Sequence, residues 1–116
     1  MPKHLLFLLA LTVILLTAYA TLAINASPFR SIPKSEVETA INQANHLFTL
    51  KKKSREDLST GPCLSNALMP DWVVDIVHSP RQPIDDLPEN QCPSYREGRA
   101  SHFVELDTDG NLIRAQ

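Results

Sequence analysis

The chain begins with one continuous hydrophobic segment. No charged side chain lies between Leu5 and Ile24, and Lys3 stands just ahead of the segment. About 20 apolar residues in a helix, at 1.5 Å each, cover the ~30 Å hydrocarbon core of a membrane. A basic start followed by an apolar run is also typical of a secretory signal peptide. Both interpretations predict that the rest of the chain works outside the cytoplasm.

The two interpretations differ in whether this segment is kept. Hydrophobicity thins after Leu16, and the sequences ending at Ala20 and Ala23 are small-x-small cleavage sites, which favours removal. The length of the segment fits a retained membrane anchor. We therefore expect three parts, listed by residue range: a signal peptide or membrane anchor over 1–24, a linker over 25–34, and a small exported domain over 35–116.

Hydrophobic residues recur at helical spacing from residue 35 to residue 53. They form one stripe, which consists of Val37, Ala40, Ile41, Ala44, Leu47 and Phe48. Polar residues such as Asn42 and His46 cover the remaining surface of this predicted helix. A stripe this wide must pack against a partner, and the rest of the chain predicts a sheet.

A strand is predicted over 72–77, where β-branched residues dominate. Alternation would place one set of side chains on one face, namely Trp72, Val74, Ile76 and His78, and the others, Val73, Asp75 and Val77, on the opposite face. Residues 54–68 are predicted to be irregular, with a turn at Gly61-Pro62.

The end of the chain predicts a β-hairpin. Residues 99–107 and 111–115 alternate in polarity on either side of Asp109-Gly110, a strong turn signal. The fold class is therefore α+β, with one amphipathic helix packed on a small antiparallel sheet that ends in this hairpin. The strand Val104-Glu105-Leu106-Asp107, the turn and the final strand resemble the small PepSY-type modules of exported proteins, and the resemblance implies no functional residue here.

Residues 79–94 form a segment that is rich in proline and acidic residues and contains almost no hydrophobic residues. A long connection without regular structure is uncommon in a small domain and is usually functional or disordered. Cys92 lies near its end and would fix it to the domain. We therefore expect an ordered loop with a role in recognition.

The chain contains two cysteines, Cys63 and Cys92. In an oxidising compartment an even pair is most simply a disulfide. Closing a loop of about 30 residues stabilises a fold by roughly 3–4 kcal/mol in the chain-entropy model. That is a large share of the ~5–15 kcal/mol available to a typical domain.

The net charge of −2 argues against a nucleic-acid partner, because such proteins present a basic face. The run Lys51-Lys52-Lys53 is best explained as the C-terminus of the predicted helix, where cations complement the helix dipole.

A metal site is one alternative to the disulfide. The four candidate ligands are Cys63, His78, Cys92 and His102, but they lack the short spacings of zinc motifs. We therefore expect no metal and no cofactor. A second alternative is a small metal-dependent or hydrolytic enzyme that uses His78, His102, Asp75 and Glu105. It requires that these four side chains converge in one cleft.

The main interpretation is a non-catalytic binding module that uses the loop 79–94. Arginines and exposed aromatic residues are frequent anchors at interfaces. The candidate contact residues are Arg81, Asp85, Asp86, Tyr95 and Arg96. The expected partner is another protein or an envelope component, and the membrane itself if residues 5–24 are retained. A purely structural anchored domain would instead leave no exposed aromatic or arginine residue on this loop.

Overall fold

The computed structural model describes residues 2–25 and 31–116. The chain divides into two compact units, Met1–Ser31 and Ile32–Gln116. The predicted linker over 25–34 includes residues 26–30, which lie outside the described residues.

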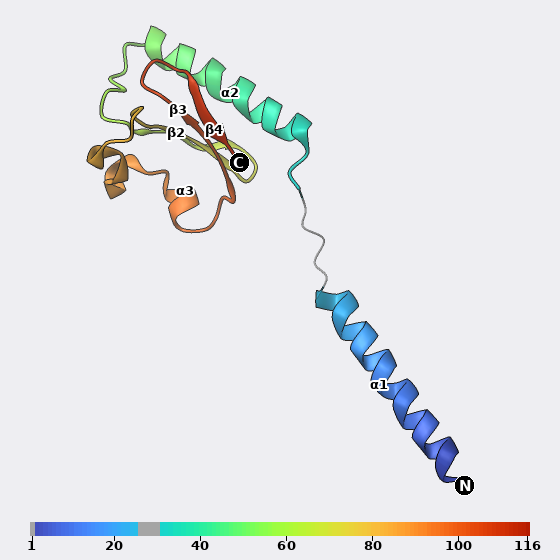
Figure 1. Cartoon of the computed structure of the whole chain (residues 1–116). Helices are drawn as coiled ribbons and strands as arrows, with labels where there is room; N and C mark the ends of the chain where they lie inside the picture. Colours follow the sequence, from blue (N-terminus) through green and yellow to red (C-terminus); the bar gives the residue numbers. More distant parts are fainter. Residues whose placement is uncertain (1, 26–30) are drawn as a thin grey trace. The chain divides into compact units, whose positions relative to one another are not determined.

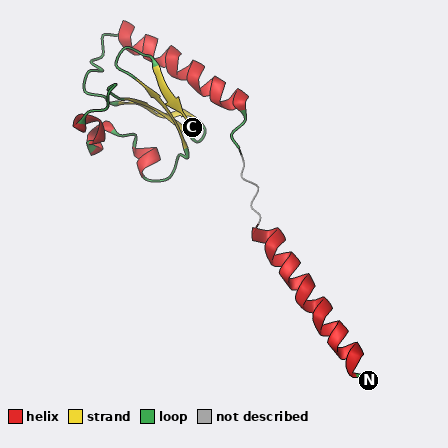
Figure 2. Ribbon diagram, viewed as in Figure 1, coloured by secondary structure: helices red, strands yellow, loops and turns green. Residues whose placement is uncertain are grey.

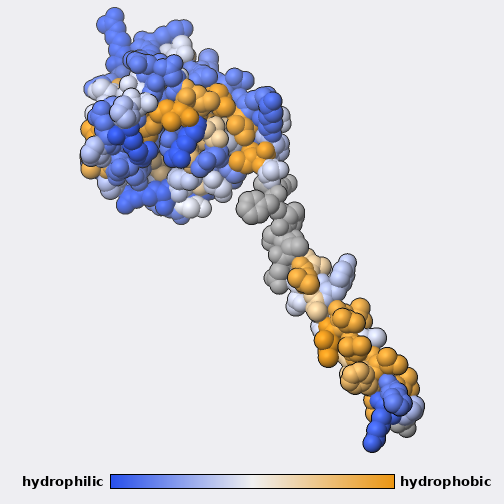
Figure 3. All heavy atoms as spheres, in the orientation of Figure 1, coloured by the Kyte–Doolittle hydropathy of each residue, from blue (hydrophilic) through white to orange (hydrophobic). Residues whose placement is uncertain are grey.

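The N-terminal unit contains helix α1 (Lys3–Asn25). At 1.5 Å per residue its 23 residues span about 35 Å, enough to cross a membrane. None of its hydrophobic stretch from Lys3 to Ile24 is buried, and hydrophobic side chains cover most of the face seen in Figure 3. The predicted apolar N-terminal helix is thus confirmed, and its position and composition suit a signal sequence or a membrane anchor.

The C-terminal unit places helix α2 (Lys34–Lys53) against a four-stranded sheet, which confirms the α+β class. The strands lie in the order β1 (Cys63–Met69), β2 (Trp72–Ile76), β3 (His102–Leu106) and β4 (Leu112–Ala115). Figures 1 and 2 show α2 along one face of the sheet, while the segment between β2 and β3 covers the other. We call that segment, residues 77–101, the crossover.

The prediction of an antiparallel sheet was wrong for one strand pair. β1 and β4 are antiparallel to their neighbours, but β2 and β3 are parallel. Parallel neighbours require a long connection that returns the chain to the same end of the sheet. The crossover is this connection. It contains the 3₁₀ turns η1 (Pro83–Asp86) and η2 (Pro88–Asn90) and the short helix α3 (Pro93–Arg96), so the proline-rich loop is ordered.

The prediction of irregular structure over 54–68 was also wrong, because β1 begins at Cys63. The strand pairs with β2 through two register shifts, one between Cys63 and Ser65 and one between Ser65 and Met69. Such irregularities interrupt the alternation of polar and hydrophobic positions from which a strand is recognised.

The face of the sheet beneath α2 carries the larger hydrophobic core. Its buried residues are Ala40, Ala44, Phe48, Leu58, Leu64, Trp72, Val74, Ile76, Val104 and Leu106. The predicted alternation of β2 is therefore confirmed from Trp72 to Ile76. The Trp72 indole Nε1 also donates a 2.8 Å hydrogen bond to the Glu36 carboxylate, which joins the strand to the first turn of α2.

Candidate functional site

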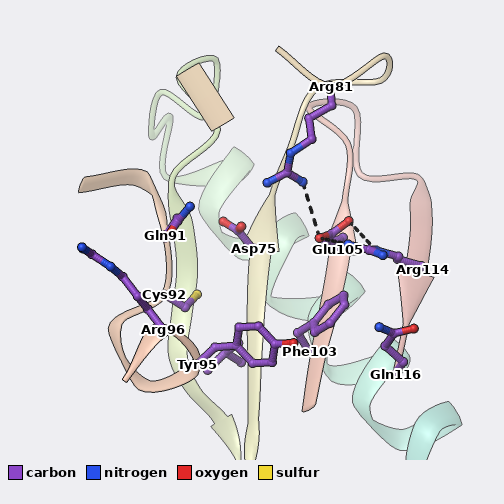
Figure 4. Close-up of a pocket in the computed structure, with 11 residues that line it drawn as sticks. Asp75, Arg81, Gln91, Cys92, Tyr95, Arg96, Phe103, Glu105, Arg114 and Gln116 are labelled. Carbon is purple, nitrogen blue, oxygen red and sulfur yellow. Dashed lines mark hydrogen bonds and ion pairs between the residues drawn. The ribbon is translucent and has the colours of Figure 1, made fainter. Parts of the chain in front are cut away.

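A cleft of about 380 Å³ lies between the crossover and the face of the sheet that is turned away from α2 (Figure 4). Val73 and Phe103, which are buried on neighbouring strands, form its apolar floor together with Cys92 of the crossover. Clefts of this size that combine an apolar floor with a few polar groups are typical binding sites for small ligands or single side chains.

The predicted disulfide joins Cys63 at the start of β1 to Cys92 in the crossover, with 4.9 Å between the two Cα atoms. It therefore fixes the crossover to the sheet at one side of the cleft. The next residues form α3, whose Tyr95 ring meets the Phe103 ring edge-on with 5.1 Å between centroids. The aromatic wall of the cleft thus depends on the position of the disulfide.

Two carboxylates lie side by side in the cleft. Asp75 on β2 and Glu105 on β3 are directly paired in the parallel register, and both project from the same face as Val73 and Phe103. The enzyme hypothesis required these two acids to lie in one cleft. In the structure they line one cleft, with Asp75 partly buried and Glu105 buried.

The environment of Asp75 favours its neutral form. Burial first, and then the negative charge of Glu105, raise the pKa of Asp75 to about 8, although an Ile76 backbone hydrogen bond and the charge of Arg81 act in the opposite direction. Asp75 Oδ1 is buried and has no hydrogen-bond partner among the residues that the structure describes. At neutral pH this carboxyl group therefore favours its protonated form, and its Oδ1 atom is buried without a partner among the described residues.

Glu105 stays paired with arginine. Arg114 on β4 binds its carboxylate with two hydrogen bonds, of 3.0 Å from Nε and 3.1 Å from Nη2. The Arg81 Nη1 atom lies 3.7 Å from the same carboxylate, as the dashed lines of Figure 4 indicate. The Arg114 guanidinium also lies 4.9 Å from the centre of the Phe103 ring, a cation–π contact.

Arg81 reaches the cleft from the start of the crossover. Its Nε and Nη2 atoms donate to the Asp86 carboxylate at 3.0 and 2.8 Å. The Asp86 side chain is exposed, so this pair holds the arginine at the rim of the cleft and is open to water. Both residues had been predicted as contact residues.

Asp85 was also predicted as a contact residue, but it is fully buried. It accepts hydrogen bonds from the backbone N–H groups of His78 and Gln82, and its Oδ1 lies 2.8 Å from His78 Nδ1. Burial opposes ionisation of this acid, yet these hydrogen bonds hold the pKa of Asp85 below its usual value. The absent side chain of Gly61 leaves room for the carboxylate, since a Cβ atom there would lie 2.5 Å from Asp85 Oδ1. Asp85 therefore shapes the beginning of the crossover.

The two histidines of the enzyme hypothesis lie outside the cleft lining. His78 is bound to Asp85, as described above. His102 projects from the α2 side of β3, where its ring packs 4.9 Å from Trp72 and its Nε2 lies 3.5 Å from Asp71 Oδ2. Of the four residues in that hypothesis, the structure brings together only Asp75 and Glu105. Within residues 2–25 and 31–116, no group of three metal-ligating side chains converges.

Of the five predicted contact residues, Arg81, Tyr95 and Arg96 line the cleft. Arg114, Gln91 and Gln116 line the cleft as well and are not among the predicted contact residues. Arg114 could have been found from the hairpin turn, because that turn sets the register that places Arg114 opposite Glu105. The two glutamines carry no comparable signal in the sequence.

Comparisons with protein-family models, curated proteins and solved structures find no match to this chain. The geometry of the cleft is therefore the basis for assigning a function.

Proposed function

We propose that this protein is a non-catalytic binding module, exported or membrane-anchored, that contacts another protein or an envelope component through the cleft and the adjoining crossover. The observation that carries the proposal is the convergence of Arg81, Tyr95 and Arg96 on one cleft. Arg81 lies ahead of η1, whereas Tyr95 and Arg96 belong to α3. The crossover must therefore fold back to bring the three residues together.

The chemistry of these residues suits recognition. Tyr95 is 44% exposed although its ring packs against Phe103, so a large rigid surface is available without further ordering of the side chain. Tyrosine and arginine at the edge of a desolvated pocket are the residue types that contribute most to binding energy at interfaces. The disulfide and the ion pairs hold the surroundings of these side chains in place, which lowers the entropy lost on binding.

Two independent features support an exported location. Helix α1 is apolar and near the N-terminus, and the Cys63–Cys92 disulfide is typical of oxidising surroundings. We infer that the C-terminal unit lies on the outer side of a membrane. Mass spectrometry of the protein from its native host would test this, because it reports both removal of the leader and the loss of two hydrogens from the cysteines.

Site-specific photo-crosslinking tests the binding role. A photoreactive phenylalanine derivative replaces Tyr95 in one variant and Asn45, which is exposed on α2, in a matched control. We expect a discrete crosslinked product from position 95 in native cells, and much less of it from position 45. The product should diminish when the unlabelled protein is present in excess. Equal labelling from both positions, or none from position 95, would contradict the proposal.

One observation favours a second candidate function, that of a hydrolase. An acid whose pKa is raised to about 8 beside an ionised acid, as in Asp75 and Glu105, is the arrangement that general acid catalysis requires. The hydrolase function would be supported if hydrolysis of an envelope polymer is lost in both Asp75→Asn and Glu105→Gln. The same activity should be retained in His78→Gln and His102→Gln. Unchanged hydrolysis in the two carboxylate variants would exclude this pair as the catalyst.

A further inference from the structure

The charges around the cleft cancel. Three arginines line it, and three carboxylates lie on the lining or act on the groups that form it; these six residues are Arg81, Arg96, Arg114, Asp85, Asp86 and Glu105. Asp75, the remaining acid, favours its neutral form at pH 7. Three positive and three negative charges sum to zero, so the cleft as a whole selects neither cations nor anions. A neutral ligand is therefore the best electrostatic match.

The arginine–carboxylate pairs keep unused hydrogen-bonding capacity. Arg114 donates to Glu105 from Nε and Nη2, and Arg81 donates to Asp86 from the same two nitrogens, although a guanidinium group has further N–H donors. The Glu105 carboxylate likewise has lone pairs beyond those that accept from Arg114. Donors and acceptors therefore lie side by side along the lining of the cleft.

A hydroxyl group fits this arrangement better than a peptide group does. One hydroxyl oxygen both donates and accepts, so it can bridge an arginine N–H and the carboxylate that the arginine binds. A peptide N–H only donates and a peptide C=O only accepts, so each matches one member of the Arg114–Glu105 pair. Gln91 and Gln116, at opposite sides of the cleft in Figure 4, add further donors and acceptors. Several neighbouring hydroxyl groups are the recurring feature of sugars.

An apolar surface lies next to these polar groups. Tyr95 is 44% exposed, and its ring meets the Phe103 ring with 5.1 Å between centroids. In Figure 4 these two rings lie together on one side of Asp75 and Glu105. A sugar ring has C–H groups on its faces and hydroxyl groups at its edge. It can therefore pack a face on Tyr95 while its hydroxyl groups reach the ion pairs.

We propose that the cleft binds a neutral sugar unit of an envelope glycan, with one face of the ring on Tyr95 and neighbouring hydroxyl groups on the Arg114–Glu105 pair. This inference rests on the binding role proposed above and names the chemistry of the partner. A volume of about 380 Å³ is near the lower end of the range for small-ligand sites, so the cleft takes a short stretch of the glycan. A domain outside the cytoplasm has direct access to such polymers.

The test is a glycan array probed with the full chain in micelles of a detergent without a sugar headgroup. The array carries neutral oligosaccharides and acidic ones that contain uronic acid or sulfate. The strongest neutral ligand is then titrated into the ¹⁵N-labelled full chain. We expect neutral glycans to bind best and to shift the amides of Tyr95, Glu105 and Arg114. Sorbitol, which has hydroxyl groups but no ring, should bind at least about tenfold more weakly.

Two pairs of proteins make the test specific for the proposed contacts. Tyr95→Ala should weaken binding of the glycan at least about tenfold, whereas Tyr95→Phe keeps the ring and should stay within about twofold of the unmodified protein. Arg114→Lys keeps the positive charge but loses the planar donor geometry, so it should weaken binding at least about fivefold. The amide spectrum of each variant shows whether the fold is intact.

The possible failures are distinguishable. No binding on the array, a preference for acidic glycans, or equal binding of sorbitol would overturn the glycan inference. Unchanged binding in Tyr95→Ala or Arg114→Lys would overturn the proposed contacts. A crosslinked product from position 95 that is digested by protease but resists periodate, which cleaves sugars, would identify a protein partner. The broader binding role would then stand without the glycan, whereas the absence of any product would remove both proposals.

Discussion

The two faces of the sheet are built from the same strands but differ in what covers them. On one face, the buried side chains of β2 and β3 pack under the continuous helix α2, and the core is apolar. On the other face, Val73 and Phe103 are followed along their strands by Asp75 and Glu105, and an irregular crossover covers them. Side chains along each strand therefore point alternately into a closed apolar core and into an open, charged cleft.

This difference indicates how the domain separates stability from recognition. A helix with an apolar stripe can fill the whole space above a sheet. A crossover with few apolar side chains cannot fill it, and a cleft therefore remains. The crossover is instead held by polar and covalent links, namely the disulfide, the buried Asp85 and the ion pairs of Arg81 with Asp86 and Glu105. We expect the helix face to determine global stability and the crossover face to determine binding.

The largest effect should come from the helix face. Trp72→Ala removes a side chain that is 1% exposed and leaves a cavity beneath α2. We expect a loss of about 3–5 kcal/mol in the free energy of unfolding, measured by urea denaturation. Trp72→Phe is the control, since it keeps much of the packing and loses the hydrogen bond to Glu36. A loss below about 1 kcal/mol for Trp72→Ala would show that this face does not determine stability.

Removal of the disulfide should have the next largest effect on stability, and this effect should be more local. Replacing Cys63 and Cys92 by serine removes a link between residues 29 apart in sequence. We expect a loss of roughly 3–4 kcal/mol from the entropy of the unfolded chain. Hydrogen exchange should speed up more in the crossover than in α2, because the disulfide attaches only the former to the sheet. Equal acceleration in both would contradict the division between the two faces.

The regular elements were predictable from the sequence because local patterns encode them. The apolar stripe of α2, the alternation of β2 and the Asp109-Gly110 turn each follow from spacing within a few residues. β1 was missed because two register shifts interrupt its alternation, and the parallel pairing of β2 with β3 was missed because no local signal specifies which edge a crossover returns to.

The cleft was predictable only in part, for the same reason. Arg81, Tyr95 and Arg96 could be selected by residue type, and Asp75 and Glu105 could be placed on one face by alternation. Their convergence depends on the path of the crossover, which is set by contacts distant in sequence, such as Cys63–Cys92 and the Ser94 backbone N–H to the Asn66 side chain. The burial of Asp85 is likewise a consequence of tertiary packing.

Asp75→Asn is expected to increase the free energy of unfolding, by less than the loss of Trp72 or of the disulfide decreases it. The folded protein binds a proton at Asp75 with a pKa of about 8, against 3.8 for the free side chain. The contribution of this protonated side chain to the free energy of unfolding is fully present below pH 4. It decreases as the pH rises towards 8 and is absent above pH 8. Asparagine has no such dependence. At pH 7 we therefore expect the variant to be more stable by roughly 1–3 kcal/mol, a range that allows for the partial exposure of the site.

The measurement is the free energy of unfolding of both proteins from pH 4 to pH 9. The difference between them should be small at pH 4, grow up to pH 8 and then stay constant. A difference that does not change with pH would mean that Asp75 ionises normally. It would also remove the unusual acid that distinguishes the crossover face from the apolar helix face.

The smallest effect tests whether the ion pairs of the cleft stabilise the fold. Arg114 is half exposed, so its pairing with Glu105 should contribute no more than about 1 kcal/mol despite its two hydrogen bonds. A double-mutant cycle of Glu105→Gln and Arg114→Gln, read by urea unfolding, isolates this interaction from the other contacts of each residue. A small coupling would show that this ion pair contributes little to the stability of the fold, as expected if the crossover face serves binding. A coupling well above 2 kcal/mol would instead assign the charged face a part in global stability, and the contrast between the two faces would no longer hold.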